Sequence, residues 1–283
     1  MIKGIILDVD GVIVGEKEGY NYPLPHKDVI ARLKKIESKG IPISICTAKP
    51  YWAAKKIIEK ADLKNLHITE GGAVIIDPLD NIVLKAHYIN KDMSVKVVNR
   101  LLKEGVYTEA YALDEYIIQS YNQPNLTKTH SNILQKEPKI VDSLQDEIAE
   151  QDIVKIMPIA KDEKDKSRIA GIFKAFEDEL TLSWGVHPVA LPHQFGIITA
   201  KGISKKQAVS EIADYSKIKP EEFLGIGDST TDWQFIEQCG YAGAVGNATQ
   251  ELRDLVSTKG KNSFIGGTVN ENGILDIFDY FNL

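Results

Sequence analysis

The chain has 283 residues, enough for one large domain or two medium ones, and its 43% hydrophobic and 26% charged residues are ordinary for a globular protein. Its net charge of −6 argues against a nucleic-acid partner, which would need a basic surface. No apolar run reaches the ~18 residues of a membrane span, and the N-terminal run lacks the length and cleavage site of a signal peptide. With two isolated cysteines and no Cys/His cluster, we expect a cytoplasmic protein without a zinc site or a membrane partner.

The first predicted strand runs directly into a carboxylate motif. Residues 4–7 form an apolar run without alternation, which is typical of a strand covered on both faces. Asp8, Val9 and Asp10 follow, and Gly11 allows a sharp turn. Open α/β sheets bind ligands at the carboxyl ends of their strands, so we expect Asp8 and Asp10 to face a site. Taken alone, the same four residues are also compatible with a simple turn or part of a calcium loop.

Strands and helices then alternate along the first part of the chain. Helical spacing predicts helices over 26–38 and 51–62, and apolar runs predict strands over 41–46 and 67–69. A turn at residue 70 leads into a further strand up to residue 77, which we expect to form a hairpin with residues 82–86. This alternation indicates a parallel sheet.

The pattern changes from about residue 87. We predict helices over 91–105, 141–149 and 163–176, and strands over 115–120, 152–158, 179–184 and 188–191, with a polar stretch over 122–130. The mixture indicates a separate α+β domain of ordinary size, inserted into the first one. We place the inserted domain at residues 83–197 and the core at residues 1–82 and 198–283.

The alternating pattern resumes at Lys201. A helix is predicted over 203–215, a strand over 223–226, a helix to about residue 238, a strand over 241–245 and a last helix over 270–280. The predicted fold class is therefore α/β, with a doubly wound, Rossmann-like parallel sheet as its core and an inserted α+β domain.

Acidic residues follow two strands that are far apart in the sequence. Asp8 and Asp10 come after the first, and Asp228 and Asp232 lie after the strand over 223–226. A doubly wound sheet can bring both pairs to one edge, where their charges would repel one another. A hard divalent cation relieves that repulsion, and a site made only of oxygen ligands favours Mg²⁺ over zinc.

Four motifs, in this order, resemble those of the haloacid dehalogenase (HAD) phosphatase superfamily. They are Asp8-Val9-Asp10-Gly11, a strand ending in Thr47, Gly202-Ile203-Ser204-Lys205, and Gly227-Asp228-Ser229-Thr230-Thr231-Asp232. The third motif is similar to the form in Cof-type members. In the Cof-type and sucrose-phosphatase-like branch, an αβ cap is inserted between the second and third motifs, which is where the α+β domain lies here. Lys201 and Lys206 remain alternatives to Lys205.

The resemblance implies a role for each motif residue. Asp8 would be the nucleophile and would form an aspartyl-phosphate, and Asp10 would be the general acid/base. Thr47 and Lys205 would bind the phosphoryl group. Mg²⁺ would be held by an Asp8 oxygen, the backbone carbonyl of Asp10, and Asp228.

Three further residues would have supporting roles. Asp232 would orient the lysine or a metal-bound water, Lys49 would add positive charge, and Asn247 would brace the backbone or lie beside the phosphate. Single residues also have ordinary structural explanations: helix caps for Thr47 and Asp228, a solvated helix residue for Lys205 and a turn for Asn247.

The expected function is that of a HAD-type phosphoric monoester hydrolase. The resemblance implies a Mg²⁺-dependent phosphatase of a small phosphorylated metabolite, with a sugar phosphate as the expected example, because an acid/base carboxylate two residues after the nucleophile separates phosphatases from dehalogenases in this family. A phosphomutase-like phosphotransferase and a non-catalytic phosphometabolite-binding protein are the alternatives. Nothing in the sequence identifies the metabolite or the oligomeric state.

Overall fold

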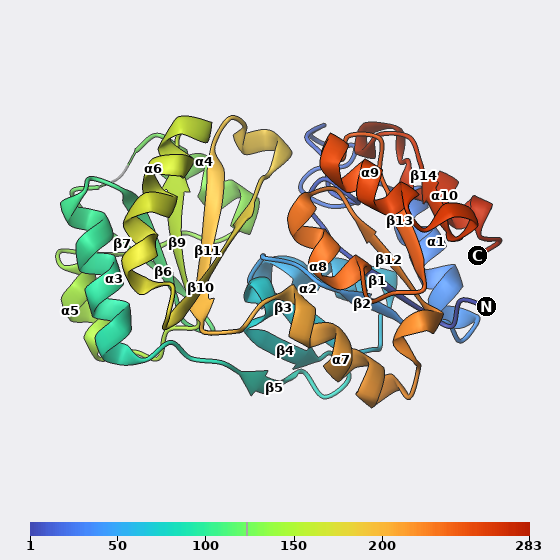
Figure 1. Cartoon of the computed structure of the whole chain (residues 1–283), viewed down its shortest axis with the longest axis horizontal. Coiled ribbons are helices and arrows are strands. Elements are labelled where there is room, and N and C mark those ends of the chain that lie inside the picture. The colour runs from blue at the N-terminus through green and yellow to red at the C-terminus, as the bar shows by residue number, and fades with distance from the viewer. Residues whose placement is uncertain (123) are drawn as a thin grey trace.

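The computed structural model describes residues 1–122 and 124–283, and it is organised around a parallel sheet of five strands in the order β14-β13-β12-β1-β2 (Figure 1). These strands are β1 (Gly4–Leu7), β2 (Ile43–Ile45), β12 (Phe223–Gly227), β13 (Tyr241–Ala244) and β14 (Ser263–Ile265). Every neighbouring pair is parallel. All four residues of β1 are buried, as the unbroken apolar run predicted, and β1 lies next to β12.

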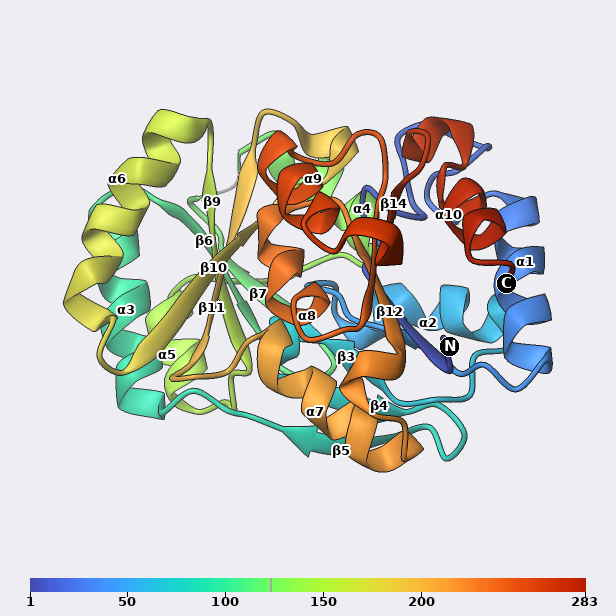
Figure 2. The same cartoon turned by 45° about the vertical axis from the view of Figure 1, so that its right-hand side comes forward.

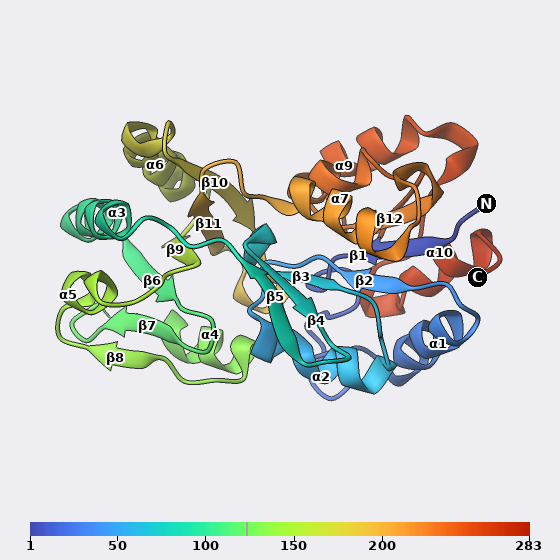
Figure 3. The ribbon, with the colours of Figure 1, turned by 90° about the horizontal axis from the view of Figure 1, so that it is seen from below.

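Helices cover both faces of this sheet. They are α1 (Lys27–Ser38), α2 (Tyr51–Ala61), α7 (Lys205–Ser216), α8 (Trp233–Ile236), α9 (Gln250–Ser257) and α10 (Ile274–Tyr280). Helix α1 packs against α2 and α10, and α8 packs against α7 and α9, so the two groups lie on opposite sides of the sheet (Figure 3). The arrangement is doubly wound, as predicted. We call this sheet with its helices the core.

A second, larger sheet has the order β10-β11-β9-β6-β7-β8. Its strands are β6 (Tyr107–Tyr111), β7 (Tyr116–Gln119), β8 (Lys139–Val141), β9 (Lys155–Ala160), β10 (Leu180–Gly185) and β11 (Gln194–Ala200), and its helices are α3 (Lys91–Lys103), α4 (Leu126–Leu134), α5 (Leu144–Ala149) and α6 (Glu163–Phe173). Helices α3 and α6 lie on the side away from the core (Figure 2), while α4 contacts α2 of the core. We call this sheet with α3 to α6 the cap.

A small antiparallel sheet connects the two parts. It contains β3 (His67–Thr69), β4 (Val74–Asp77) and β5 (Ile82–Ala86), and the pairing of β4 with β5 confirms the predicted hairpin. The 3₁₀ turn Glu70–Gly72 between β3 and β4 contacts β11 of the cap and α7 of the core. The predicted domain boundaries fall inside β5 and β11, and the division at residues 82/83 and 197/198 remains our proposal.

Some predicted elements differ from the structure. The prediction of a strand over 188–191 is wrong, because Pro188–Ala190 form a 3₁₀ turn. The His187 side chain caps this turn by accepting a hydrogen bond from the Val189 amide. The next strand, β11, begins at Gln194. The polar stretch over 122–130 contains the start of α4, and Gln123 within it lies outside the described residues. Among the described residues, no helix is long and apolar enough to span a membrane.

Candidate active site

The carboxyl end of β1 forms the floor of the site. The ladder between β1 and β12 pairs Leu7 with Ile226, so Asp8 and Asp228 emerge from neighbouring strands at the same edge. Val9 is fully buried in the core, while Gly11 turns the chain with φ +77°. This turn brings the Gly11 backbone against the Asp228 carboxylate, since a Cβ at Gly11 would fall within that side chain.

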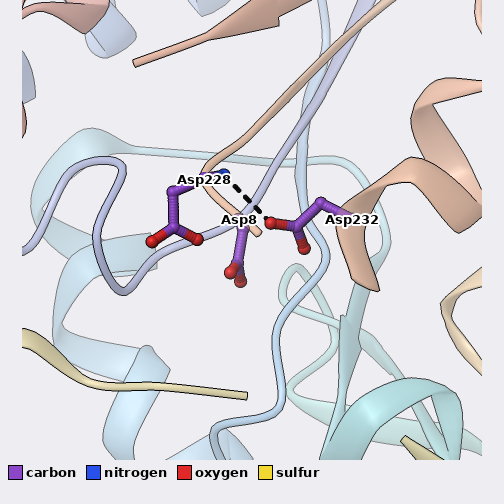
Figure 4. Close-up of side chains that lie close together, drawn as sticks. All are labelled: Asp8, Asp228 and Asp232. Atoms are coloured by element: carbon purple, nitrogen blue, oxygen red, sulfur yellow. Dashed lines mark hydrogen bonds between the residues drawn. The ribbon is translucent and has the colours of Figure 1, made fainter. Parts of the chain in front are cut away.

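Three buried aspartates converge at this edge (Figure 4). One carboxylate oxygen each of Asp8, Asp228 and Asp232 lies within 4.8 Å of the others. Asp232 is held firmly in place: its Oδ2 accepts from the amides of Asp228 and Ser229, both at 3.0 Å. Both oxygens of Asp232 already accept hydrogen bonds from the protein, so Asp8 and Asp228 are the better candidates for binding a cation.

Lys205 supplies positive charge to this cluster. Its Nζ lies 3.2 Å from Asp8 Oδ1 and donates to Asp232 Oδ1 at 2.7 Å, with only 5% of the side chain exposed. Lys205 is the first residue of α7, whose N-cap is Ser204. The two alternative lysines have other partners. Lys201 donates to the backbone carbonyl of Glu177, and Lys206 forms an ion pair with Glu237, the residue after α8. The geometry therefore places Lys205, of these three lysines, beside Asp8.

Asp10 has different partners from Asp8. Its Oδ1 lies 2.9 Å from Lys49 Nζ and 3.1 Å from His187 Nε2. His187 comes from the cap, and because its Nδ1 accepts from the Val189 amide, its proton is on Nε2, facing Asp10. The sequence did not identify His187 as a site residue, because it has no metal-ligand spacing with another histidine.

The remaining predicted residues have distinct places. Thr47 is buried after β2, and its Oγ1 accepts from the Lys49 amide at 3.1 Å. Asn247 braces the Gly11 turn: its Nδ2 donates to Gly11 O at 2.9 Å, and its Oδ1 accepts from the Val269 amide at 2.7 Å. This geometry fits the backbone-bracing role expected for Asn247.

Two adjoining cavities meet at Asp10. A cavity of about 40 Å³ is lined by the proposed phosphate-binding and metal-binding residues, among them Asp8, Thr47, Lys205 and Asp228. A second cavity of about 50 Å³ extends between core and cap, with mostly apolar walls and Lys49, His130, Lys155 and His187 as its basic residues. Asp10 lines both cavities, so a molecule that fills both would pass its carboxylate.

The pKa values show where positive charge is lacking. Burial raises the pKa of Asp8 to about 7, and Asp232 and Asp10 add to this effect while Lys205 opposes it. Burial, with repulsion from Asp232 and Asp8, also raises the pKa of Asp228 well above its ordinary value. Burial alone would raise the pKa of Asp10 as well, but Lys49 and His187 outweigh it and lower that pKa.

These residues fit a bound Mg²⁺. The donor atoms are all carboxylate oxygens, which suit a hard cation. Among the described residues, Asp8 Oδ1 is buried without a hydrogen bond, although Lys205 lies at salt-bridge distance. A cation would satisfy this oxygen and would favour the ionised forms of Asp8 and Asp228.

Gly11→Ala is expected to impair this site strongly. Both Gly11 and Gly19 have positive φ, so alanine costs about 1 kcal/mol of backbone strain at either position. Only at Gly11 does the added Cβ meet the Asp228 carboxylate; at Gly19 no described atom lies within 4 Å of it. We expect Gly11→Ala to lower the affinity for Mg²⁺ at least tenfold, measured by titration calorimetry, and Gly19→Ala to match the wild type. Equal affinities would contradict this reading.

Comparison with known proteins agrees with this architecture. The haloacid dehalogenase-like hydrolase family matches residues 5–278. The chain is 23% identical to phosphatase YwpJ of Bacillus subtilis (strain 168), covering 90% of this chain and 93% of that protein, and 23% identical to a phosphoglycolate phosphatase of Sulfolobus acidocaldarius, covering 90% and 88%. The HAD subclass IIB sugar phosphatase BT4131 superposes with a TM-score of 0.79 at 18% identity, over 99% of both chains.

The chain belongs to the haloacid dehalogenase-like hydrolases. These comparisons confirm the predicted resemblance to the family, the predicted α/β fold class and the predicted enzyme class, a HAD-type phosphatase.

Proposed function

We propose that the protein is a Mg²⁺-dependent phosphatase that hydrolyses a small phosphorylated metabolite through an aspartyl-phosphate on Asp8. The observation that carries this proposal is the convergence of Asp8, Lys205 and Asp228 at the ends of two neighbouring parallel strands. Sugar phosphates are the first substrates to test, because the fold neighbour BT4131 is a sugar phosphatase. Phosphoglycolate is the next, since several relatives are phosphoglycolate phosphatases.

We place the enzyme in the cytoplasm, where the buried, free thiols of Cys46 and Cys239 would stay reduced.

The residues divide the reaction into two steps. In the first, an Asp8 oxygen attacks phosphorus, the bond from phosphorus to the alcohol oxygen breaks, and Asp10 gives that oxygen a proton. In the second, Asp10 takes a proton from water as the water attacks the aspartyl-phosphate and releases phosphate. Lys49 and His187 favour the carboxylate form of Asp10, which suits the second step. The proton that Asp10 takes from water in that step is the one that it must still carry to act as the acid in the next turnover.

Positive charge around the phosphoryl group comes from several sources. Lys205 lies beside Asp8 and would offset charge on the phosphoryl oxygens, with Thr47 donating a hydrogen bond. Asp8, Asp228 and the backbone carbonyl of Asp10 would hold Mg²⁺, which would supply positive charge to the reaction.

The two cavities suggest how a substrate would be placed. The phosphate would occupy the cavity beside Asp8, and the alcohol part would occupy the cavity between core and cap, with Asp10 at their junction. Both cavities are small, which favours a leaving group of a few carbon atoms in this closed arrangement. A cap that covers the alcohol would also exclude water during the first step.

A phosphate-release screen with Mg²⁺ tests the proposal. The panel should contain sugar phosphates, phosphorylated hydroxy acids and nucleotides, with products identified by mass spectrometry and NMR. We expect free phosphate from at least one small phosphate ester. Conversion of a sugar phosphate to its isomer with little free phosphate would indicate a phosphomutase, and binding without turnover across the panel would indicate a binding protein.

A further inference from the structure

Lys155 on β9 of the cap is buried against the loop that follows β2 of the core. This side chain is fully buried, and its Nζ lies 2.5 Å from an oxygen of Glu70, in the turn between β3 and β4. The same Nζ donates to Ala48 O at 2.9 Å and lies 3.8 Å from the centre of the Tyr111 ring. One ammonium group therefore joins the cap to the loop after β2 of the core and to the turn Glu70–Gly72 of the connecting sheet.

The turn Glu70–Gly72 and Lys155 together shape the loop that follows β2. Three consecutive carbonyls of this loop accept hydrogen bonds: Thr47 O from the Gly71 amide at 3.0 Å, Ala48 O from Lys155 Nζ at 2.9 Å, and Lys49 O from the Glu70 amide at 3.0 Å. The outer two donors belong to the turn of the connecting sheet. The middle donor belongs to the cap, so this part of the loop is complete only when β9 is docked.

The loop carries two residues of the proposed site. Thr47 lines the phosphate cavity, and Lys49 holds Asp10 through the contact of 2.9 Å. Between them lies Ala48, whose carbonyl Lys155 binds. A shift of the Ala48 peptide would move both neighbours, because Thr47 Oγ1 also accepts from the Lys49 amide.

The buried ion pair between Lys155 and Glu70 depends on the position of the cap, because burying either charge alone costs free energy. Both Glu70 and Lys155 are almost completely removed from solvent, and such a pair is tolerated only when each charge has its partner. Separation of cap and core would break the contact between them and leave Ala48 O without this donor. The pair therefore exists only in the docked arrangement of the two parts.

We propose that Lys155 is a positioning residue through which docking of the cap sets the Thr47–Lys49 loop for catalysis. The proposal rests on the proposed function for its effect on turnover, whereas its effect on the loop is independent of that function. Lys155 also lines the cavity between core and cap, but its ammonium group binds Ala48 and Glu70 and contacts none of the predicted reacting groups.

The test uses three variants of the full chain. Lys155→Met keeps the length of the side chain but leaves Glu70 buried without its partner, so it is expected to lower the Tm. The double variant Glu70→Gln/Lys155→Met removes both charges and is expected to recover most of that Tm. Lys164→Met, at an exposed position on α6 of the cap, is the matched control and should behave as the wild type.

Two readouts separate positioning from stability. With the best substrate from the screen and Mg²⁺, we expect the double variant to lose about 100-fold in kcat, as for a displaced catalytic loop. Hydrogen exchange of the peptide covering residues 46–53 should be faster in the double variant than in the wild type. Recovery of both the Tm and wild-type kcat in the double variant would overturn the proposal, as would unchanged exchange in this peptide. If the wild type releases no phosphate from any substrate, the proposed function fails, and the exchange measurement still decides the role of Lys155.

Discussion

Asp8→Asn is expected to abolish phosphate release while leaving the fold intact. Asparagine fills the same space, but its amide cannot attack phosphorus as a carboxylate does. Loss of a nucleophile from a working site typically costs at least about a thousandfold in turnover. The fold should tolerate the change, because burial is the main cause that raises the pKa of Asp8 and the neutral amide avoids this cost. Lys205 keeps its hydrogen bond to Asp232.

Activity and stability should be measured on the same preparations. Phosphate release with the best substrate from the screen gives the activity, and the Tm from thermal unfolding shows whether the variant is folded. Asp178→Asn, at an exposed position, is the matched control and should resemble the wild type in both. An Asp8→Asn enzyme that retains activity within tenfold of the wild type would exclude Asp8 as the nucleophile. Rapid quench and mass spectrometry should find one added PO₃ unit on the wild-type peptide containing residue 8.

The core of the fold was predictable because local sequence determines it. Residues 4–7 are apolar without interruption, and they form the buried strand β1 next to β12. Helix α1 buries Val29, Leu33 and Ile36, which recur at the spacing that the helical prediction used. Since parallel strands end at the same edge, the strand assignments indicated that Asp8 and Asp228 could meet, and the pairing of β1 with β12 brings the two strand ends together.

The cap was harder to predict because distant partners determine it. Strand β6 was missed because Glu109 and Thr108 give it a polar character, yet both are buried. Glu109 accepts hydrogen bonds from Tyr107 and Tyr111, and it pairs with His130 of α4 at 2.9 Å. No local sequence pattern indicates that a glutamate in a strand will be buried and will accept hydrogen bonds from three side chains.

The same reason explains which site residues were missed. His187 and Lys155 lie in the inserted region, and each reaches the core through a contact between residues more than eighty positions apart. The motifs at strand ends are read from single segments, whereas these contacts depend on how the cap sits on the core. A buried lysine in an otherwise apolar strand, such as Lys155 in β9, is the one local signal that could have been used.

Removal of Mg²⁺ is expected to abolish turnover and to destabilise the protein in a manner that depends on pH. Burial raises the pKa of Asp8 from its ordinary 3.8 to about 7 when no cation is bound. The folded chain then holds a proton that the unfolded chain releases. The stabilisation from this proton is present below a pH of about 4 and is lost as the pH rises through 7. Asp228, whose pKa is also raised, acts in the same direction.

Mg²⁺ would replace these protons, so its binding should strengthen as the pH rises. At pH 8 and a concentration a hundred times the Kd, Mg²⁺ should stabilise the fold by about 2.7 kcal/mol and raise the Tm by about 5 °C or more. At pH 5.5, where protons already neutralise the cluster, chelation should change the Tm much less. Thermal unfolding with and without a chelator at both pH values measures this, and Asp228→Asn should lose most of the shift at pH 8. Full activity after thorough chelation, or a larger Tm shift at pH 5.5 than at pH 8, would show that these carboxylates do not bind the metal.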